Sequence, residues 1–193
     1  MSDPTAPSGA TAAERWRVVA DGFSARVDGV AAGGWDAPAP CDGWVARDVV
    51  VHLVEWVPGL LDVGAAVDLG PLPDPATDPV GAWRALRAGI DALLADPEVD
   101  ARRFSHPQAG DHALPEAIGI FVTPDVFVHT WDLARATGQD ERLDPAIVHE
   151  SVAGLSALDP DFLASTGQYG PRIDVPPDAD EQTRLLALLG RRP

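Results

Sequence analysis

Apolar residues recur at helical spacing through most of this chain, and this period is the feature that most restricts its fold. In the segment after Thr11, large apolar side chains follow one another at three- and four-residue steps. They are Trp16, Val19, Phe23, Val27 and Val30. Such spacing places side chains on one face of an α-helix, where they can meet a common core. Thr11 and Glu14 also have the spacing of a capping box, so we expect the helix to begin there.

The same period returns in residues 45–56 and in the segment after Asp78. Pro58 and Gly59 are expected to kink or end the first of these helices, because proline lacks the N–H that a helix interior uses. In the kinked case, one or two further helical turns follow these residues. Asp78 is expected to cap the second helix, which then begins at Pro79.

A longer apolar stretch runs from about residue 114 to Gly138 and contains Pro124. We expect a kink or a restart of the helix at this proline. In the restart case Thr123 is the N-cap. Asp125 then lies near a helix N-terminus, where the helix dipole favours a negative charge.

Two shorter helices are expected in the last third of the chain. One is predicted from Asp144 to about Leu158. The other is predicted to end at Gly190, and Asp178 and Glu181 have the spacing of its capping box.

No strand pattern competes with these helices. Pro-rich or polar stretches between them, such as 69–79 and 95–113, are predicted to be loops. We therefore expect an all-α fold, with four longer helices as a bundle core and shorter additions. Residues 1–10 are predicted to be a disordered tail and residues 11–193 a single domain, which suits a chain of this length.

Composition argues against several classes of function. The formal net charge is −16, and such a surface repels phosphate backbones and anionic lipid, so neither nucleic acid nor membrane is expected as a partner. Cys41 is the only cysteine, so no intramolecular disulfide can form. The sequence shows no signal-peptide pattern and no run of eighteen apolar residues, so we expect a cytoplasmic protein.

The strongest candidates for a functional site are His52, Asp125 and His129. Asp125 and His129 are four residues apart, so a helix would place them on one face about one turn from each other. If the helix that carries His52 packs beside them, the three form a two-histidine, one-carboxylate metal site with positions left for water or substrate. Zinc is the first expectation, and nickel, iron or manganese suit the same ligands. The alternative is that both histidines are ordinary buried residues.

Two segments around these residues resemble a known family. CDGWVARDVVVHLVEW and DVFVHTWDLARATG are similar to segments of the DinB-like proteins, and more closely to the N-terminal domain of mycothiol-dependent maleylpyruvate isomerase. The closing segment, YGPRIDVPPDADEQTRLLALLGRRP, is similar to the tail of a short, single-domain branch of that group that is common in actinobacteria. The resemblance implies an up-down-down-up four-helix bundle whose metal triad falls on His52, Asp125 and His129.

The chain departs from the isomerase in two respects. The isomerase has glutamate at the acidic ligand position, where this chain has Asp125. It also has a C-terminal domain that completes its active site, and this sequence ends without one. We therefore do not expect maleylpyruvate isomerisation itself.

Three functional hypotheses follow. In the first, the chain is a metal-dependent transferase or isomerase-like enzyme that uses a small thiol, in this setting mycothiol, against a small electrophilic substrate. In the second, it is a non-catalytic metal- or small-molecule-binding bundle. In the third, the histidines are buried and bind nothing. A homodimer is plausible for a small bundle, although nothing in the sequence proves one.

Residues near the expected ligands have two interpretations each. Glu55 and Asp132 lie three residues after His52 and His129, so either could orient a ligand histidine. The slightly favoured interpretation is a salt bridge, for example between Asp132 and Arg135. Arg47 is expected either to hold an anionic substrate or to form a surface ion pair.

The remaining candidates are expected to have ordinary roles. Trp56 and Trp131 are predicted to pack in the core, and Cys41 is predicted to be a small buried residue rather than an oxidisable thiol. Three further histidines are predicted to be solvated or on the surface rather than ligating. They are His106, His112 and His149.

Overall fold

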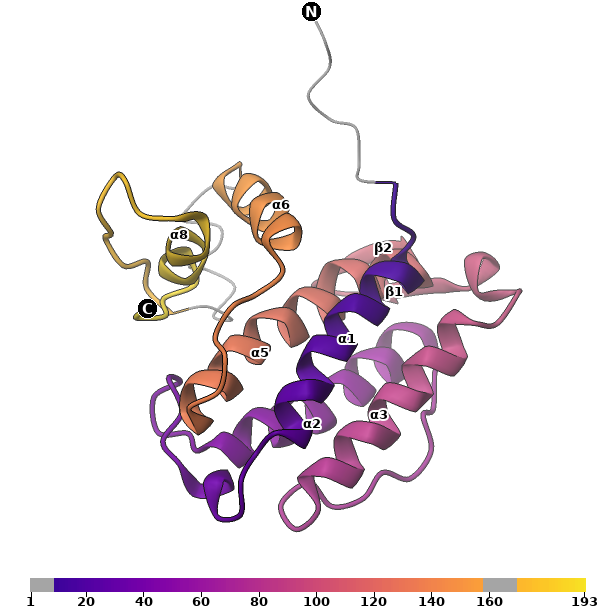
Figure 1. Ribbon diagram of the computed structural model, residues 1–193. Helices are drawn as coiled ribbons and strands as arrows, with labels where there is room; N and C mark the ends of the chain where they lie inside the picture. Colours follow the sequence, from indigo (N-terminus) through magenta and orange to yellow (C-terminus); the bar gives the residue numbers. More distant parts are fainter. Residues whose placement is uncertain (1–8, 158–169) are drawn as a thin grey trace, which may run out of the picture.

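The four long helices of the protein pack around one apolar core. The computed structural model describes residues 9–157 and 170–193. The long helices are α1 (Ala12–Asp28), α2 (Ala46–Ala65), α3 (Pro79–Leu94) and α5 (Thr123–Thr137). Helix α1 contacts α3 and α5, and α2 contacts the same two, so each long helix has two long neighbours (Figure 1). The chain is therefore mostly helical, as its periodicity predicts.

Helix α1 begins and packs as the sequence predicts. The backbone N–H of Glu14 donates to the Thr11 hydroxyl at 3.2 Å, and the Thr11 N–H donates to the Glu14 carboxylate at 2.8 Å, which completes the capping box. The predicted apolar stripe is buried as far as Val27. Phe23 meets Trp83 of α3 edge-on, with 4.5 Å between ring centroids. These aromatic contacts fix how α1 and α3 pack.

Helix α2 does not end at Pro58, but continues to Ala65. A proline in a helix interior costs about 3 kcal/mol. Val57 and Leu61, on either side of it, are fully buried, and burying each such side chain stabilises the fold by about 1.5–3 kcal/mol. Packing of the second half of α2 therefore outweighs the lost backbone hydrogen bond. Ala66, with a left-handed φ of 50°, ends the helix instead.

The helix around Pro124 is continuous rather than restarted. Helix α4 (Leu114–Ala117) leads into a π-helical segment, η3 (Ile118–Val122), which leads directly into α5. A π-helical turn is a common way to accommodate a break in the hydrogen-bond ladder. Thr123 is the first residue of α5 and not its N-cap, and its buried hydroxyl has no hydrogen-bond partner among the described residues. Asp125 does lie in the first turn of α5.

The segment predicted as a polar loop between α3 and α4 contains a short hairpin. Strand β1 (Arg103–His106) pairs antiparallel with β2 (Gly110–Ala113), after a 3₁₀ turn at Val99–Ala101 (η2). Phe104 is fully buried and lies against Gly64 of α2, where any larger side chain would clash with its ring. With one large apolar side chain in its two four-residue strands, the hairpin has no sequence period, so the all-α prediction missed it.

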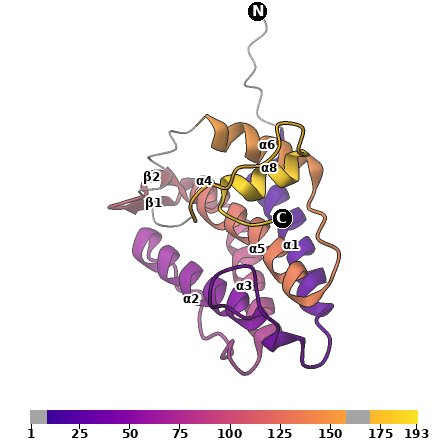
Figure 2. The same ribbon diagram turned by 90° about the vertical axis from the view of Figure 1, so that its left-hand side faces the viewer.

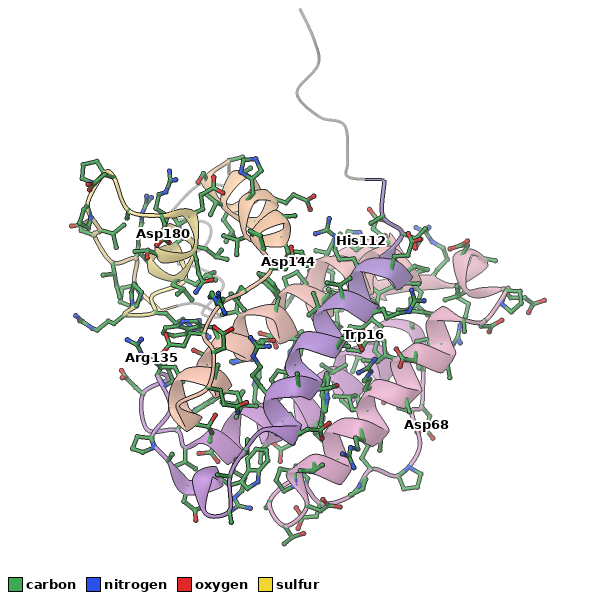
Figure 3. The ribbon with its side chains drawn as sticks, viewed as in Figure 1. Trp16, Asp68, His112, Arg135, Asp144 and Asp180 are labelled. Atoms are coloured by element: carbon green, nitrogen blue, oxygen red, sulfur yellow. The ribbon has the colours of Figure 1, made fainter. Side chains whose placement is uncertain are left out.

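Helices α6 (Pro145–Ser156) and α8 (Glu181–Leu188) contact each other and lie to one side of the long helices (Figures 1 and 2). Asp144 caps α6 as predicted. Asp180, not Asp178, caps α8, because its carboxylate accepts from the N–H of Thr183 at 2.7 Å. Both caps are labelled in Figure 3. Three leucines of the α8 segment join the main core. They are Leu185, Leu186 and Leu189.

Some predictions fall on parts of the chain that the structure does not describe. Most of the expected tail, residues 1–8, and the expected end of α6 at Leu158 lie outside the described residues. Among the helices that are described, none combines the length and the apolar character that a membrane span requires.

Candidate metal centre

Helices α2 and α5 bring His52, Asp125 and His129 together. Nε2 of His52 lies 3.1 Å from Oδ2 of Asp125, and Nε2 of His129 lies 3.5 Å from Oδ1 of the same carboxylate. The two imidazole rings meet edge to face, with 4.9 Å between their centroids. One ligand atom from each residue lies within 4.8 Å of the other two. The convergence expected from the helical spacing is therefore present.

These separations suit a common cation. Nitrogen and oxygen ligands bind zinc at about 2.0–2.2 Å, so two ligands of one tetrahedral ion lie about 3.3–3.6 Å apart. The observed 3.5 Å already lies in that range, and the 3.1 Å separation needs only a small side-chain movement to reach it. The side chains of His52 and Asp125 are 31% and 28% exposed, so the group is open to solvent on one side. An open side is what a further ligand would need.

His129 is supported from its other ring nitrogen by Asp132. Nδ1 of His129 lies 2.9 Å from Oδ2 of Asp132, although the pair lacks the geometry of a well-formed hydrogen bond. Asp132 is completely buried. The favoured prediction, a salt bridge, is present, but its partner is Arg191 at 3.0 Å and not Arg135, which pairs with Glu141 at 2.7 Å. The other interpretation, a carboxylate behind a ligand histidine, fits the geometry.

Arg191, from the segment after α8, neutralises Asp132. Its Nη2 donates to Oδ2 at 3.0 Å, and its Nε approaches Oδ1 at 3.4 Å. Burial acts to raise the pKa of Asp132, but the contact with His129 and the charge of Arg191 together hold that pKa below its ordinary value. Burial likewise acts to lower the pKa of Arg191, and the Asp132 charge reverses the effect. Asp132 is therefore an anion paired with a cation.

A second group of ligand types shares His129. Sγ of Cys41 lies 3.7 Å from Oδ2 of Asp132, and these two with His129 could in principle hold an ion. Burial, followed by the Asp132 charge, raises the pKa of the Cys41 thiol to about 12. A cysteine binds metal as the thiolate, and Arg191 already brings a positive charge 3.9 Å from Sγ. The group with His52 is the better cation site.

Two tryptophans flank the imidazoles. Trp44 stacks on His129, with 5.8 Å between ring centroids and an angle of 18°, and it also lies 5.3 Å from His52. Trp56 stacks on the His52 ring at 6.0 Å and 10°. Trp131 is buried in the core as predicted, and Trp56 is half-buried, packs against the core and also stacks on His52. The aromatic rings limit the rotation of both imidazoles.

The loop that carries Trp44 is held by backbone contacts. It follows η1 (Gly34–Asp36) and is closed by an antiparallel bridge between Pro38 and Val45. The N–H of Ala39 donates to the carbonyl of Trp44 at 2.9 Å. The backbone from which the indole projects is therefore held in place.

Other candidates named from the sequence lie elsewhere or have other partners. Glu55 is exposed. Arg47 pairs with Asp36 at 3.0 Å, which confirms the surface ion pair. His149 is exposed and pairs with Glu181 of α8. His106 and His112 are half-buried on the hairpin, with local hydrogen bonds to residues of the same turn, and they do not belong to the triad.

Two residues of the site had no signal in the sequence. Trp44 sits in a Pro- and Gly-rich loop, where periodicity says nothing about its direction. Arg191 is 59 residues from Asp132, and no short motif links the two. Asp132 is a buried carboxylate that does not pair with Arg135, the arginine of its own helix, and this is the one indication that a cation from elsewhere had to exist.

Comparison with known proteins places the chain in a family. The sequence model of the "Mycothiol maleylpyruvate isomerase N-terminal domain" family matches residues 16–134. Two curated relatives are the uncharacterized proteins Rv0738 and MT0763 of Mycobacterium tuberculosis strains H37Rv and CDC 1551. Each is 32% identical over 174 residues, covering 89% of this chain and 92% of the relative. No solved structure gives a significant match.

The match begins within α1 and ends within α5, and it contains His52, Asp125, His129 and Asp132. The α6–α8 segment with Arg191 lies beyond the match. The expected resemblance is thereby confirmed: the chain belongs to the mycothiol maleylpyruvate isomerase N-terminal domain family.

Proposed function

We propose that this protein binds one divalent cation through Nε2 of His52, the carboxylate of Asp125 and Nε2 of His129. Zinc is the favoured ion. The observation that carries the proposal is the convergence of three ligand atoms from two facing helices within 4.8 Å. The neighbouring positions of α1, α2, α3 and α5 also support the DinB-like, up-down-down-up four-helix bundle as the architecture. Such bundles build metal sites from side chains on facing helices.

We further propose that the site serves a thiol-dependent transferase or isomerase-like enzyme that acts on a small electrophile. The family name supports mycothiol as the thiol. A bound divalent cation would lower the pKa of a coordinated small thiol so that the thiol is held as the thiolate. The chain need not supply a nucleophile of its own. Cys41 is unsuited to that role, because its pKa is raised to about 12.

The chain's own residues would orient the reactants and limit water. Asp132 presents its carboxylate to Nδ1 of His129, which leaves Nε2 directed at Asp125. Trp44 and Trp56 cover the imidazole faces with apolar surface. The exposed sides of His52 and Asp125 are where the thiol and the electrophile would enter.

A non-catalytic metal-binding or small-molecule-binding role is the second candidate. One observation favours it: among the described residues, Asp132 is the only carboxylate outside the triad that forms an ion pair with a triad histidine. Asp132 is buried and paired, so it is not placed to exchange protons with a substrate. A catalytic role then depends on the thiol alone.

Metal content tests the first proposal. Protein without a histidine tag is loaded with zinc, dialysed and analysed for metal, and we expect about one ion per chain. His52→Ala and Asp125→Ala should each lose it. His149→Ala is the matched control, because His149 is exposed and remote from the triad. Equal zinc in the wild type and in His52→Ala would overturn the site.

Thiol consumption separates the enzyme from the binding protein. Mycothiol and model electrophiles are incubated with the zinc-loaded protein, with and without chelator. An enzyme shows a protein-dependent rate that chelator removes. Stabilisation by zinc, with no effect of any thiol on rate or melting temperature, supports the non-catalytic candidate.

A further inference from the structure

A turn at the end of α8 directs Arg191 into the core of the site. The N–H of Arg191 donates to the carbonyl of Leu186 at 2.8 Å, and the N–H of Gly190 donates to that of Ala187 at 3.2 Å. This pair of bonds is the Schellman motif, which requires a left-handed residue after the helix. Gly190 fills that position with a φ of 76°. A Cβ on Gly190 would also lie 2.7 Å from the backbone of Gly170.

Core packing fixes where this turn lies. Leu185, Leu186 and Leu189 are buried in the same cluster as the long helices. The α8 segment is therefore anchored against the bundle, and the Arg191 guanidinium that follows it is only 13% exposed. It meets both oxygens of Asp132, at 3.0 and 3.4 Å. A two-point contact of this kind fixes the orientation of a carboxylate as well as its charge.

The oriented carboxylate is the one that faces His129. Oδ2 of Asp132 lies between Nη2 of Arg191 at 3.0 Å and Nδ1 of His129 at 2.9 Å. The Asp132 carboxylate thus contacts Nδ1 of the imidazole, while Nε2 of the same ring faces Asp125. Carboxylates behind ligand histidines set the tautomer and direction of the ring, and their loss weakens metal binding.

We propose that Arg191 is a positioning residue of the candidate metal centre, which it reaches through Asp132 and His129. The proposal rests on the metal site proposed above and assigns a role to the segment beyond the family match. Arg191 holds Asp132, Asp132 holds His129, and the C-terminal turn thereby controls the affinity of the site. Removing Arg191 leaves the three ligands in place but frees the His129 ring.

Zinc affinity in a double-mutant cycle tests the proposal. Titration calorimetry compares the wild type with Arg191→Met, Asp132→Asn and the double variant. Methionine keeps the apolar stem and removes the charge. We expect Arg191→Met to weaken zinc binding by about 10-fold or more. In the Asp132→Asn background the same change should cost less than about twofold, because Arg191 acts through Asp132.

Two further variants sharpen the cycle. Arg192→Met is the matched control, because Arg192 is the exposed neighbour and should bind zinc like the wild type. Arg191→Lys keeps the charge but not the two-point contact, and it should fall between the wild type and Arg191→Met. It provides a second single variant if Arg191→Met does not fold, which circular dichroism would show.

The outcomes distinguish this proposal from the metal site itself. If the wild type binds zinc through His52 and Arg191→Met binds it equally well, the role of Arg191 is wrong and the metal site stands. Equal losses in both backgrounds mean that Arg191 acts only through general packing, which also overturns the proposal. A wild type that binds no zinc overturns both.

Discussion

The two ring nitrogens of His129 face different surroundings. On the Nε2 side, Asp125 and His52 are about 30% exposed and carry one negative charge between them when the imidazole is neutral. On the Nδ1 side, Asp132 is fully buried and Arg191 balances its charge. Both sides offer a carboxylate and a second ligand type, His52 or Cys41. The comparison teaches that two groups of similar ligand types can differ in charge balance: Arg191 already compensates Asp132, whereas among the described residues no arginine pairs with Asp125.

The largest expected effect concerns Cys41 on the compensated side. With a pKa of about 12, its thiol should react with iodoacetamide at pH 8 about three orders of magnitude more slowly than an ordinary cysteine thiol. The rate should keep rising with pH up to that value, because the thiolate is the reacting form. Mass spectrometry follows the reaction, and the denatured protein is the control. Rapid labelling of the folded protein would show that this side is open.

The next largest effect is on the free energy of unfolding, which should differ between substitutions of two aspartates on the same helix. Asp132→Ala leaves Arg191 buried without its partner and should lower the free energy of unfolding by about 3–5 kcal/mol. Asp125→Ala removes a partly exposed carboxylate and should change it by less than about 1 kcal/mol in metal-free protein. Urea denaturation measures both. Similar values for the two variants would contradict the contrast between the sides.

Zinc should stabilise the fold only through the Nε2 side of His129, where His52 and Asp125 lie. At 100 times its dissociation constant, zinc raises the free energy of unfolding by about 2.7 kcal/mol. We expect His52→Ala to lose this gain and Cys41→Ala to keep it, as judged by thermal melting with and without zinc. The reverse result would place the ion between Cys41 and Asp132 instead.

The smallest effect is expected at Glu55. It lies one turn from His52 but is exposed. Glu55→Ala should therefore change stability by no more than about 0.5 kcal/mol and leave zinc affinity unaltered. A clear loss of affinity on calorimetry would mean that the open side extends to Glu55.

Much of the fold could be predicted from local sequence. The cap at Thr11, the apolar stripe of α1 and the cap at Asp144 depend on residues within one turn of each other, and all three were confirmed. The continuation of α2 through Pro58 could not be predicted, because it depends on what Val57 and Leu61 pack against. The hairpin could not be predicted for a similar reason, since Phe104 is placed by its packing against Gly64 of α2.

In the candidate site too, local sequence predicts some features and tertiary packing decides the others. The four-residue spacing of Asp125 and His129 is a property of one helix, so the sequence could place both on one face. That His52 would join them was an expectation about packing, and the structure brings the three together. The partner of Asp132 was misjudged because Arg135 was near in sequence, while Arg191 was nearer in space.

The sequence by itself determined where most of the helices begin and which side chains each helix presents together, because hydrogen bonds and caps act over three or four residues. The tertiary structure alone decided which side of His129 is compensated. That outcome depends on a guanidinium 59 positions away, carried by a turn whose place is set by core packing. Burial then makes the pairing matter, since a charge removed from water must find its opposite within a few ångströms.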